Sequence, residues 1–302
     1  MIREYGLEPS LLSNWNDFRY FIEKFGVPQG RLISRFPRDW KRCVYESLVG
    51  CGVIERKRIE EGLVNIDKLL FKRHSEWNNE VMWLENAEQE HARKPFHAII
   101  AKTNPRSLTY VLEADSLTDA NPLWKTQRCM IITRSPESIA GCARTLIQVS
   151  KIIKLVDPYF APGELRYRQT LDAICSCFSP HASGTHLRFE IHVKDGSQSP
   201  QYYQSLCHKV LPPLVPNTFQ VHVMQWKEIS GGEKLHNRFI LTDKGGLSFG
   251  VGLDSGEEGH SDEVQLLEED VSRTRFSQYD IHSSAFGLVS KFSITGTKRT
   301  SP

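Results

Sequence analysis

The sequence predicts an α/β protein in which a mixed β-sheet is flanked by helices. Two observations support this prediction. After about residue 150, apolar runs of strand length alternate with segments of helical pattern. Two of these runs are joined at residues 243–246 by Asp-Lys-Gly-Gly, which is typical of a tight turn between antiparallel strands.

Length and composition indicate an ordinary globular protein. The chain has 302 residues, which favours two domains or one large one, and 39% of them are hydrophobic. This composition excludes disordered, collagen-like and disulfide-scaffold proteins. The net charge is only +2, so any basic binding surface has to be local. We find no apolar run long enough to span a membrane and no leader-like segment in MIREYGLEPS, and therefore expect a cytoplasmic protein.

The seven cysteines are an odd number at scattered spacings, which argues against a disulfide framework. Cys175-x-Cys177 and the pair Cys207-His208 lack the CxxC spacing of a structural zinc site. We expect thiols of the core or surface, and neither a metal nor a cofactor. A metal site at these residues is the alternative that the sequence leaves open.

Residues 1–75 have the pattern of a helical module. Apolar residues recur at spacings of three and four from Trp15 to Phe25, as on one face of an amphipathic helix. Two further helices are predicted at 37–48 and 56–70, with glycines in the connections.

Part of this module is basic and contains aromatic residues. Phe36 and Trp40 lie between the basic residues, and Asp39 is the one acid there. Such a mixture can bind phosphates and stack on bases, so it is a candidate nucleic-acid surface. The alternative is a solvated helix face with both aromatic side chains in the core. The candidate residues are Arg31, Arg35, Arg38, Lys41 and Arg42.

Residues 76–147 form a mixed connecting region in this prediction. Short strands are expected at 97–101 and 130–133. A helix is expected at 134–148, because Ser135 suits its N-cap and Pro136 its first position.

The third predicted region is a domain at 148–290, followed by a flexible tail at 291–302. Alternating or continuous apolar runs predict its strands, and residues with helical pattern predict its helices. The strands are expected at 151–160, 186–194, 219–226, 235–242 and 247–253, and the helices at 200–210 and 263–279.

The residues with the clearest chemical potential lie around the predicted hairpin. His236 and Arg238 are two positions apart, so on a strand they share one face. Asp243 follows five residues later, and the glycine-rich returning segment leads to Asp254. A histidine, a fixed cation and a carboxylate are thus expected to lie close together.

The pattern His-x-Arg-x4-Asp-x6-Gly resembles the HxKx4Dx6G signature of the phospholipase D superfamily, with Gly250 at its last position. The segment KIIKLVDPYF is similar to the strand that opens the fold of that family. The resemblance implies that His236 attacks phosphorus and that Arg238 holds the phosphate oxygens. It also implies a role for Asp243, and it places Asp254 near the family's asparagine and Glu263 near its second acid.

One subgroup of the family is more similar still. The phospholipase D-like domain at the C-terminus of MIT-domain proteins also has His-x-Arg and an ending like GVGLD at 250–254. Members of that subgroup bind membranes or lipids. The chain departs from the enzymes at Arg238, which replaces lysine, and at Asp254, whose charge repels a phosphate unless a cation neutralises it.

The chain has one complete motif, whereas the enzymes use two histidines. A second pair, His192-x-Lys194, lacks an aspartate at the required distance. The resemblance to single-motif nucleases therefore implies a homodimer with two copies of His236, in a setting such as bacterial antiviral defence. The substrate is nucleic acid or another phosphodiester, cleaved without a metal. The alternatives are a catalytically inactive module that binds phosphate, a lipid headgroup or a partner protein, and a structural subunit of a larger complex.

Overall fold

The computed structural model describes residues 1–178, 187–196 and 198–299, and it confirms the α/β fold class. The chain divides into two compact units, Ile2–Arg128 and Cys129–Pro302, with Met1 counted in the second. His186 of a predicted strand and residues 300–302 of the predicted tail lie outside the described residues. No helix within the described ranges is long and apolar enough to cross a membrane.

The first unit contains a five-stranded sheet in the order β3-β2-β1-β4-β5, and every neighbouring pair in it is parallel. Its strands are β1 (Arg3–Leu7), β2 (Arg31–Ser34), β3 (Leu70–Phe71), β4 (Ala98–Ala101) and β5 (Val111–Glu113). Its helices are α1 (Trp15–Lys24), α2 (Trp40–Ser47), α3 (Val53–Val64) and α4 (Trp83–Arg93). Short 3-10 helices are η1 (Pro9–Leu12), η2 (Val27–Gln29), η3 (Ile66–Leu69) and η4 (Ala114–Ser116).

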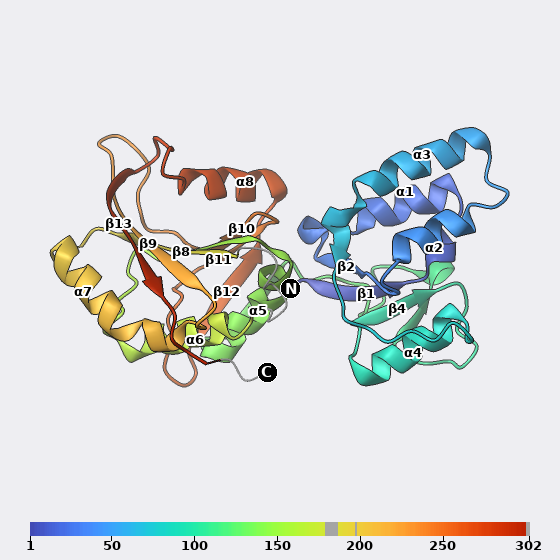
Figure 1. Cartoon of the computed structure of the whole chain (residues 1–302), viewed down its shortest axis with the longest axis horizontal. Helices are drawn as coiled ribbons and strands as arrows, with labels where there is room; N and C mark the ends of the chain where they lie inside the picture. Colours follow the sequence, from blue (N-terminus) through green and yellow to red (C-terminus); the bar gives the residue numbers. More distant parts are fainter. Residues whose placement is uncertain (179–186, 197, 300–302) are drawn as a thin grey trace. The chain divides into compact units, whose positions relative to one another are not determined.

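Helices cover both faces of this sheet (Figure 1). Ala98 and Ile100 pack with apolar residues of α1, α2 and α3. Ile99 and Ala101, which alternate with them along β4, pack on the other face with Ala87 of α4. Because both faces are buried, the strands have no alternation of apolar and polar residues.

The three helices predicted in residues 1–75 are present, but the prediction of a purely helical module was wrong. Strands β1, β2 and β3 also lie in this range. They have two to five residues each, and β2 is buried along its whole length, so no period of two marks them in the sequence. The unit boundary lies after Arg128, rather than at residues 75 and 147 as predicted.

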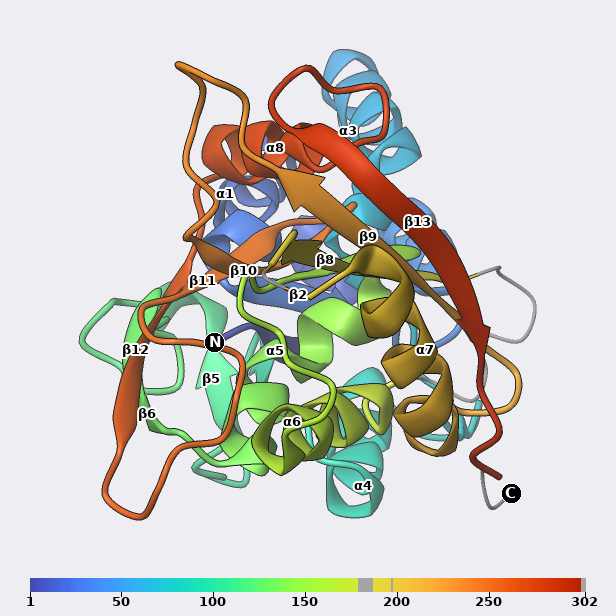
Figure 2. The same cartoon turned by 90° about the vertical axis from the view of Figure 1, so that its left-hand side faces the viewer.

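The second unit contains an eight-stranded mixed sheet in the order β13-β9-β8-β7-β10-β11-β12-β6. Its strands are β6 (Cys129–Thr133), β7 (Ile152–Val156), β8 (Arg188–Lys194), β9 (Gln220–Lys227), β10 (Arg238–Thr242), β11 (Gly246–Phe249), β12 (Ser261–Leu266) and β13 (Gly287–Thr295). Its helices are α5 (Pro136–Val149), α6 (Leu165–Cys175), α7 (Pro200–Val210), the 3-10 helix η6 (Pro212–Leu214) and α8 (Glu269–Gln278). Helices α5, α6 and α7 lie on one face of the sheet and α8 on the other (Figures 1 and 2).

The directions of these strands bring many loops to one edge of the sheet. Strands β7, β8 and β9 are parallel, and β10, β11, β12 and β6 then alternate in direction. The carboxyl ends of β6, β7, β8, β9 and β11 therefore meet the amino ends of β10 and β12. We call this the carboxyl edge. It holds the candidate site.

Two further predictions in this unit were wrong. Residues 261–266 form strand β12 rather than the start of a helix at Glu263, and α8 begins at Glu269. Exposed and buried residues alternate along β12, which is the period of a strand with one solvated face. The domain does not end at 290, because β13 continues to Thr295 and Lys298 pairs with Asp172.

Substitution of Gly62 on α3 would test how tightly this helix packs against Phe18 of α1. A Cβ at this position would lie 2.5 Å from Cε1 of the buried Phe18 ring. We expect Gly62→Ala to lower the free energy of unfolding by about 1–3 kcal/mol, because the ring has to move. Gly141→Ala on α5 is the control, since nothing lies within 4 Å of that Cβ. It should raise the free energy by about 0.5–1 kcal/mol. Equal effects of the two changes in urea unfolding would contradict this account.

Candidate functional site at the carboxyl edge

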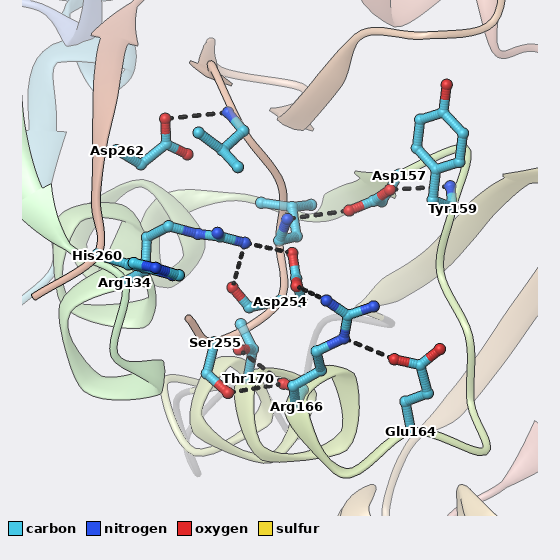
Figure 3. A network of polar contacts seen from close by, with 12 residues as sticks. Arg134, Asp157, Tyr159, Glu164, Arg166, Thr170, Asp254, Ser255, His260 and Asp262 are labelled. Atoms are coloured by element: carbon cyan, nitrogen blue, oxygen red, sulfur yellow. Dashed lines mark hydrogen bonds and ion pairs between the residues drawn. The ribbon is translucent and has the colours of Figure 1, made fainter. Parts of the chain in front are cut away.

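The carboxylate of Asp157 joins two loops at the carboxyl edge. Asp157 follows β7 and is 1% exposed. Its Oδ1 accepts a hydrogen bond from the backbone N–H of Tyr159 at 2.9 Å, and its Oδ2 accepts one from Leu253 at 2.9 Å (Figure 3). The pKa of Asp157 is raised overall, because the effect of burial outweighs the opposing effects of these two hydrogen bonds and of the charge of Arg238. The loop after β7 and the loop after β11 are thereby held together.

Asp254 is neutralised by two arginines that the sequence analysis did not select. Its Oδ1 lies 2.6 Å from Nη2 of Arg134, and its Oδ2 lies 3.0 Å from Nη1 of Arg166 (Figure 3). Arg134 follows β6 and Arg166 lies in the first turn of α6. The sequence led us to expect a carboxylate that repels phosphate unless it is neutralised, and the structure supplies that neutralisation.

Asp262 shapes the turn that follows β11. Its Oδ1 accepts hydrogen bonds from the backbone N–H groups of Gly250, Val251 and Glu263, at 3.0, 3.0 and 2.8 Å. Asp262 is 4% exposed, and its Oδ2 has no hydrogen-bond partner among the described residues. The glycine-rich segment is thus fixed by one buried carboxylate at each end, Asp262 and Asp157.

His236 and Arg238 lie at the amino end of β10, but not on one strand as predicted. Strand β10 begins at Arg238, and His236 belongs to the preceding loop, where it is exposed. Nδ1 of His236 lies 3.2 Å from the backbone oxygen of Lys234. A carbonyl oxygen can only accept, so this contact requires a proton on Nδ1, and in the neutral form of the ring Nε2 then has the lone pair.

Arg238 is half-buried beneath an aromatic ring. Its Cζ lies 4.8 Å from the centroid of the Tyr159 ring, which is the geometry of a cation–π contact. Its buried Nε has no hydrogen-bond partner among the described residues. The guanidinium is therefore positioned by packing against this ring.

Glu228 organises the segment that leads to His236. Nζ of Lys194 and Nζ of Lys234 lie 2.7 and 3.0 Å from its two carboxylate oxygens, and the backbone N–H of Leu235 donates to it at 3.1 Å. The hydrogen bonds from the two lysines and from Leu235 lower the pKa of Glu228 to about 2. The segment before His236 is thus tied to the ends of β8 and β9.

His192, which the sequence analysis considered for a second half-site, is a structural residue. It is 1% exposed; Nε1–H of Trp226 donates to its Nδ1 at 3.0 Å, and its Nε2–H donates to Glu190 at 2.9 Å. Both ring nitrogens are used, so His192 offers no lone pair to a substrate. Burial lowers the pKa of His192.

Of the other predicted catalytic residues, Asp243 lies away from His236, and Glu263 lies on β12, two strands across the sheet from β10. Asp243 follows the opposite end of β10, about 17 Å from Arg238 at the usual rise per strand residue. Its Oδ1 accepts hydrogen bonds from the backbone N–H of Lys151 and Ile152, at 2.8 and 3.0 Å, so it anchors the start of β7. Glu263 is exposed on β12, where it contacts Cys129 and Gln265.

The basic segment at 31–42 is divided between β2 and α2. Arg31 is buried, with Cζ 4.0 Å from the Trp124 ring centroid, and it donates to the backbone oxygen of Trp124. Phe36 and Trp40 are core residues, so the stacking role was wrong and the alternative interpretation of these aromatics holds. Among the other candidates, Arg35 donates to the backbone oxygen of Arg38, Lys41 pairs with Asp67, and Arg42 pairs with Glu46.

Sequence reasoning missed Arg134, Arg166, Asp157 and Asp262 as parts of the site. Arg134 could have been found, because it comes directly after the strand predicted at 130–133. Asp157 lies inside the strand predicted at 151–160, which in the structure ends at Val156. Asp262 was hidden by the wrong helix prediction. Arg166 has no local signal, since only the packing of α6 brings it to Asp254.

The described residues contain no group of three or more side chains that could hold a metal ion. The alternative of a metal site at Cys175 and Cys177 or at the pair Cys207-His208 therefore has no support in this part of the chain, where the three thiols are buried.

Comparison with known proteins gives only distant likenesses. No family model matches the chain, and no curated protein matches it. One similar solved structure is Nuc from Salmonella typhimurium, a phospholipase D family member, at 8% identity and a TM-score of 0.35 over 53% of this chain and 97% of that one. Another is TrmBL2, an archaeal chromatin protein described with a mode of DNA binding, at 10% identity and a TM-score of 0.31 over 84% of this chain and 69% of that one. At these TM-scores, a function has to be argued from the residues of the site.

The two ion pairs of Asp254 predict a large loss of folding stability when its carboxylate is removed. Asp254→Ala leaves Arg134, whose side chain is 10% exposed, without its partner, so we expect the free energy of unfolding to fall by about 3 kcal/mol. Glu164→Ala is the control, because it removes a half-exposed partner of Arg166 and should cost about 1 kcal/mol or less. Similar losses for both variants in denaturant unfolding would show that Asp254 is not the buried centre of this network.

Burial of His192 predicts acid sensitivity. Its pKa in the folded state lies below the ordinary 6.5, so the unfolded chain binds the proton more readily. Neutral His192 therefore makes its full contribution to the free energy of unfolding above about pH 6.5. As the pH falls below this value the contribution decreases, by at most about 1.4 kcal/mol per pH unit for one proton. The His192→Gln variant lacks this titration, and its unfolding free energy should depend less on pH between 7 and 5 than that of the wild type. Parallel pH profiles would contradict the assignment.

Proposed function

We propose that the chain is a phosphodiesterase of phospholipase D type that cleaves nucleic acid without a metal, as a homodimer. The observation that carries the proposal is the state of His236. Its Nδ1 lies within hydrogen-bond distance of a backbone oxygen, which leaves Nε2 as the nucleophilic atom of the neutral ring, and the ring is exposed two residues before a half-buried arginine. A nucleophile and a phosphate ligand therefore lie at the same end of β10.

In the proposed reaction, Nε2 of His236 attacks phosphorus and the bond from phosphorus to the leaving oxygen breaks. His236 of the partner subunit donates a proton to that oxygen. Water then attacks the phosphohistidine, returns a proton to the second histidine and releases His236. Arg238 supplies N–H donors to the phosphate oxygens, whose negative charge grows in the transition state.

The remaining residues would hold this arrangement in place. Asp157 and Asp262 fix the glycine-rich loop beside Arg238, and Glu228 fixes the segment before His236. Asp254 does not repel the substrate, because Arg134 and Arg166 compensate its charge. Asp243 supports the strand from its far end.

A second candidate is a binding module without catalysis. The packing of Arg238 against Tyr159 favours it, because this contact holds the guanidinium whether or not a reaction occurs. In that case the site binds a phosphate, a lipid headgroup or a phosphorylated partner protein, and His236 contributes a hydrogen bond only.

Activity on bis-(4-nitrophenyl) phosphate and on DNA, with EDTA present, tests the proposal. We expect His236→Ala to lower the turnover rate about a thousandfold or more, because the nucleophile is lost. Arg238→Lys should keep most of the activity and Arg238→Ala should not, since lysine is also a cationic phosphate ligand.

His208→Ala is the matched control, because this exposed histidine lies in the last turn of α7. Sedimentation should show a dimer. Activity that persists in His236→Ala, or that EDTA abolishes, would rule the mechanism out. Phosphate binding without turnover would favour the binding module.

A further inference from the structure

Two exposed tyrosines lie on adjoining segments at the carboxyl edge. Tyr159 is in the loop after β7 and is 54% exposed, and Tyr202 is in the first turn of α7 and is 57% exposed. Their neighbours in the chain, Phe160 and Tyr203, are buried. The hydroxyl of Tyr203 donates to the backbone oxygen of Phe160 at 3.1 Å, so the two segments are held together at the residues that follow the two exposed tyrosines.

One cation contacts the Tyr159 ring, and two lysines lie on segments at the same edge. The guanidinium of Arg238 lies 4.8 Å from the Tyr159 ring centroid. Lys194 ends β8, the strand that precedes α7, and Lys234 lies two residues before His236; their side chains are 40% and 74% exposed. Both lysines pair with Glu228, and an ammonium group has three N–H donors, so each can also contact a phosphate.

From this juxtaposition we infer that Tyr159 and Tyr202 stack on unpaired bases and make the carboxyl edge a binding surface for single-stranded nucleic acid. The inference rests on the proposed function, whose substrate it specifies. Aromatic faces next to cations are the usual means of binding single strands, because every base has a π-face and every linkage has a charge. In a duplex the faces of the bases are covered by their neighbours, so a stacking surface selects single strands.

A lipid surface fits these residues less well. Membrane contact needs exposed aliphatic side chains that enter the acyl layer together with basic residues. Leu165 and Val251 are exposed at this edge, but Leu165 adjoins Glu164 and Val251 is fixed through its backbone by Asp262.

Binding is measured by fluorescence anisotropy on the full chain carrying His236→Ala, so that no substrate is consumed. The probes are a single-stranded oligodeoxynucleotide, its duplex and the same strand with abasic sites. We expect tighter binding to the single strand than to the duplex. Tyr202→Ala should weaken binding about tenfold, as the loss of one stacked base requires. Tyr159→Phe should bind as the parent does, and Tyr159→Leu should weaken binding to a similar extent as Tyr202→Ala.

The abasic strand separates stacking from a structural effect. Against it, Tyr202→Ala and the parent should bind equally, because no base remains to stack. Tyr45→Ala, which removes an exposed tyrosine of α2, is the matched control and should bind every probe as the parent does. A loss that Tyr202→Ala shows equally with the abasic and the normal strand would overturn the inference.

Other outcomes distinguish this inference from the proposed catalysis. If the wild type cleaves DNA but the tyrosine variants bind normally, the stacking role is wrong and the proposed function stands. If base-dependent binding occurs without cleavage, the binding surface stands and the catalytic mechanism falls. Binding to phosphatidylserine vesicles but not to the single strand would overturn the inference in favour of a lipid surface.

Discussion

The buried carboxylate of Asp157 is the interaction on which the candidate site depends. It accepts one hydrogen bond from its own loop, at Tyr159, and one from the loop after β11, at Leu253. A buried carboxylate without such donors would be costly, so the two loops have to stay in register for the unit to be stable. Tyr159 in turn packs over Arg238, and the loop after β11 carries Asp254. One side chain thus sets the positions of both.

The ion pairs of Asp254 change what its negative charge implies for the candidate site. In sequence terms an aspartate beside a phosphate site argues against activity. In the structure Arg134 and Arg166 approach its two oxygens from β6 and α6, so the carboxylate acts as an anchor for the loop. The charge of this aspartate is thus compensated by residues that lie outside the pattern in which the sequence resembles phospholipase D.

The strand order of the second unit also limits how two copies of the chain could bring both His236 residues to one phosphate. Strand β10 is separated from the sheet edge at β6 by β11 and β12. If two copies of the chain paired through their outermost strands β6, their His236 residues would lie about 34 Å apart at the usual spacing between strands. A homodimer with both histidines at one phosphate therefore requires two carboxyl edges that face each other. The exposed position of His236, ahead of the first residue of β10, is compatible with that requirement.

The sequence by itself determined the α/β class, the β10–β11 hairpin, helices α1, α5 and α7, and the closeness of His236 and Arg238, because local periods and turn residues encode these features. It could not reveal the parallel sheet of the first unit, whose short strands are buried on both faces, and it mistook β12 for a helix. Nor could it show that Arg31 is a core residue or that His192 is fully bonded. These outcomes, like the pairing of Asp254 with two arginines, depend largely on contacts between residues far apart in the chain, such as Arg31 with Trp124 and Arg134 with Asp254. Only the packing of helices and strands against one another brings those residues together.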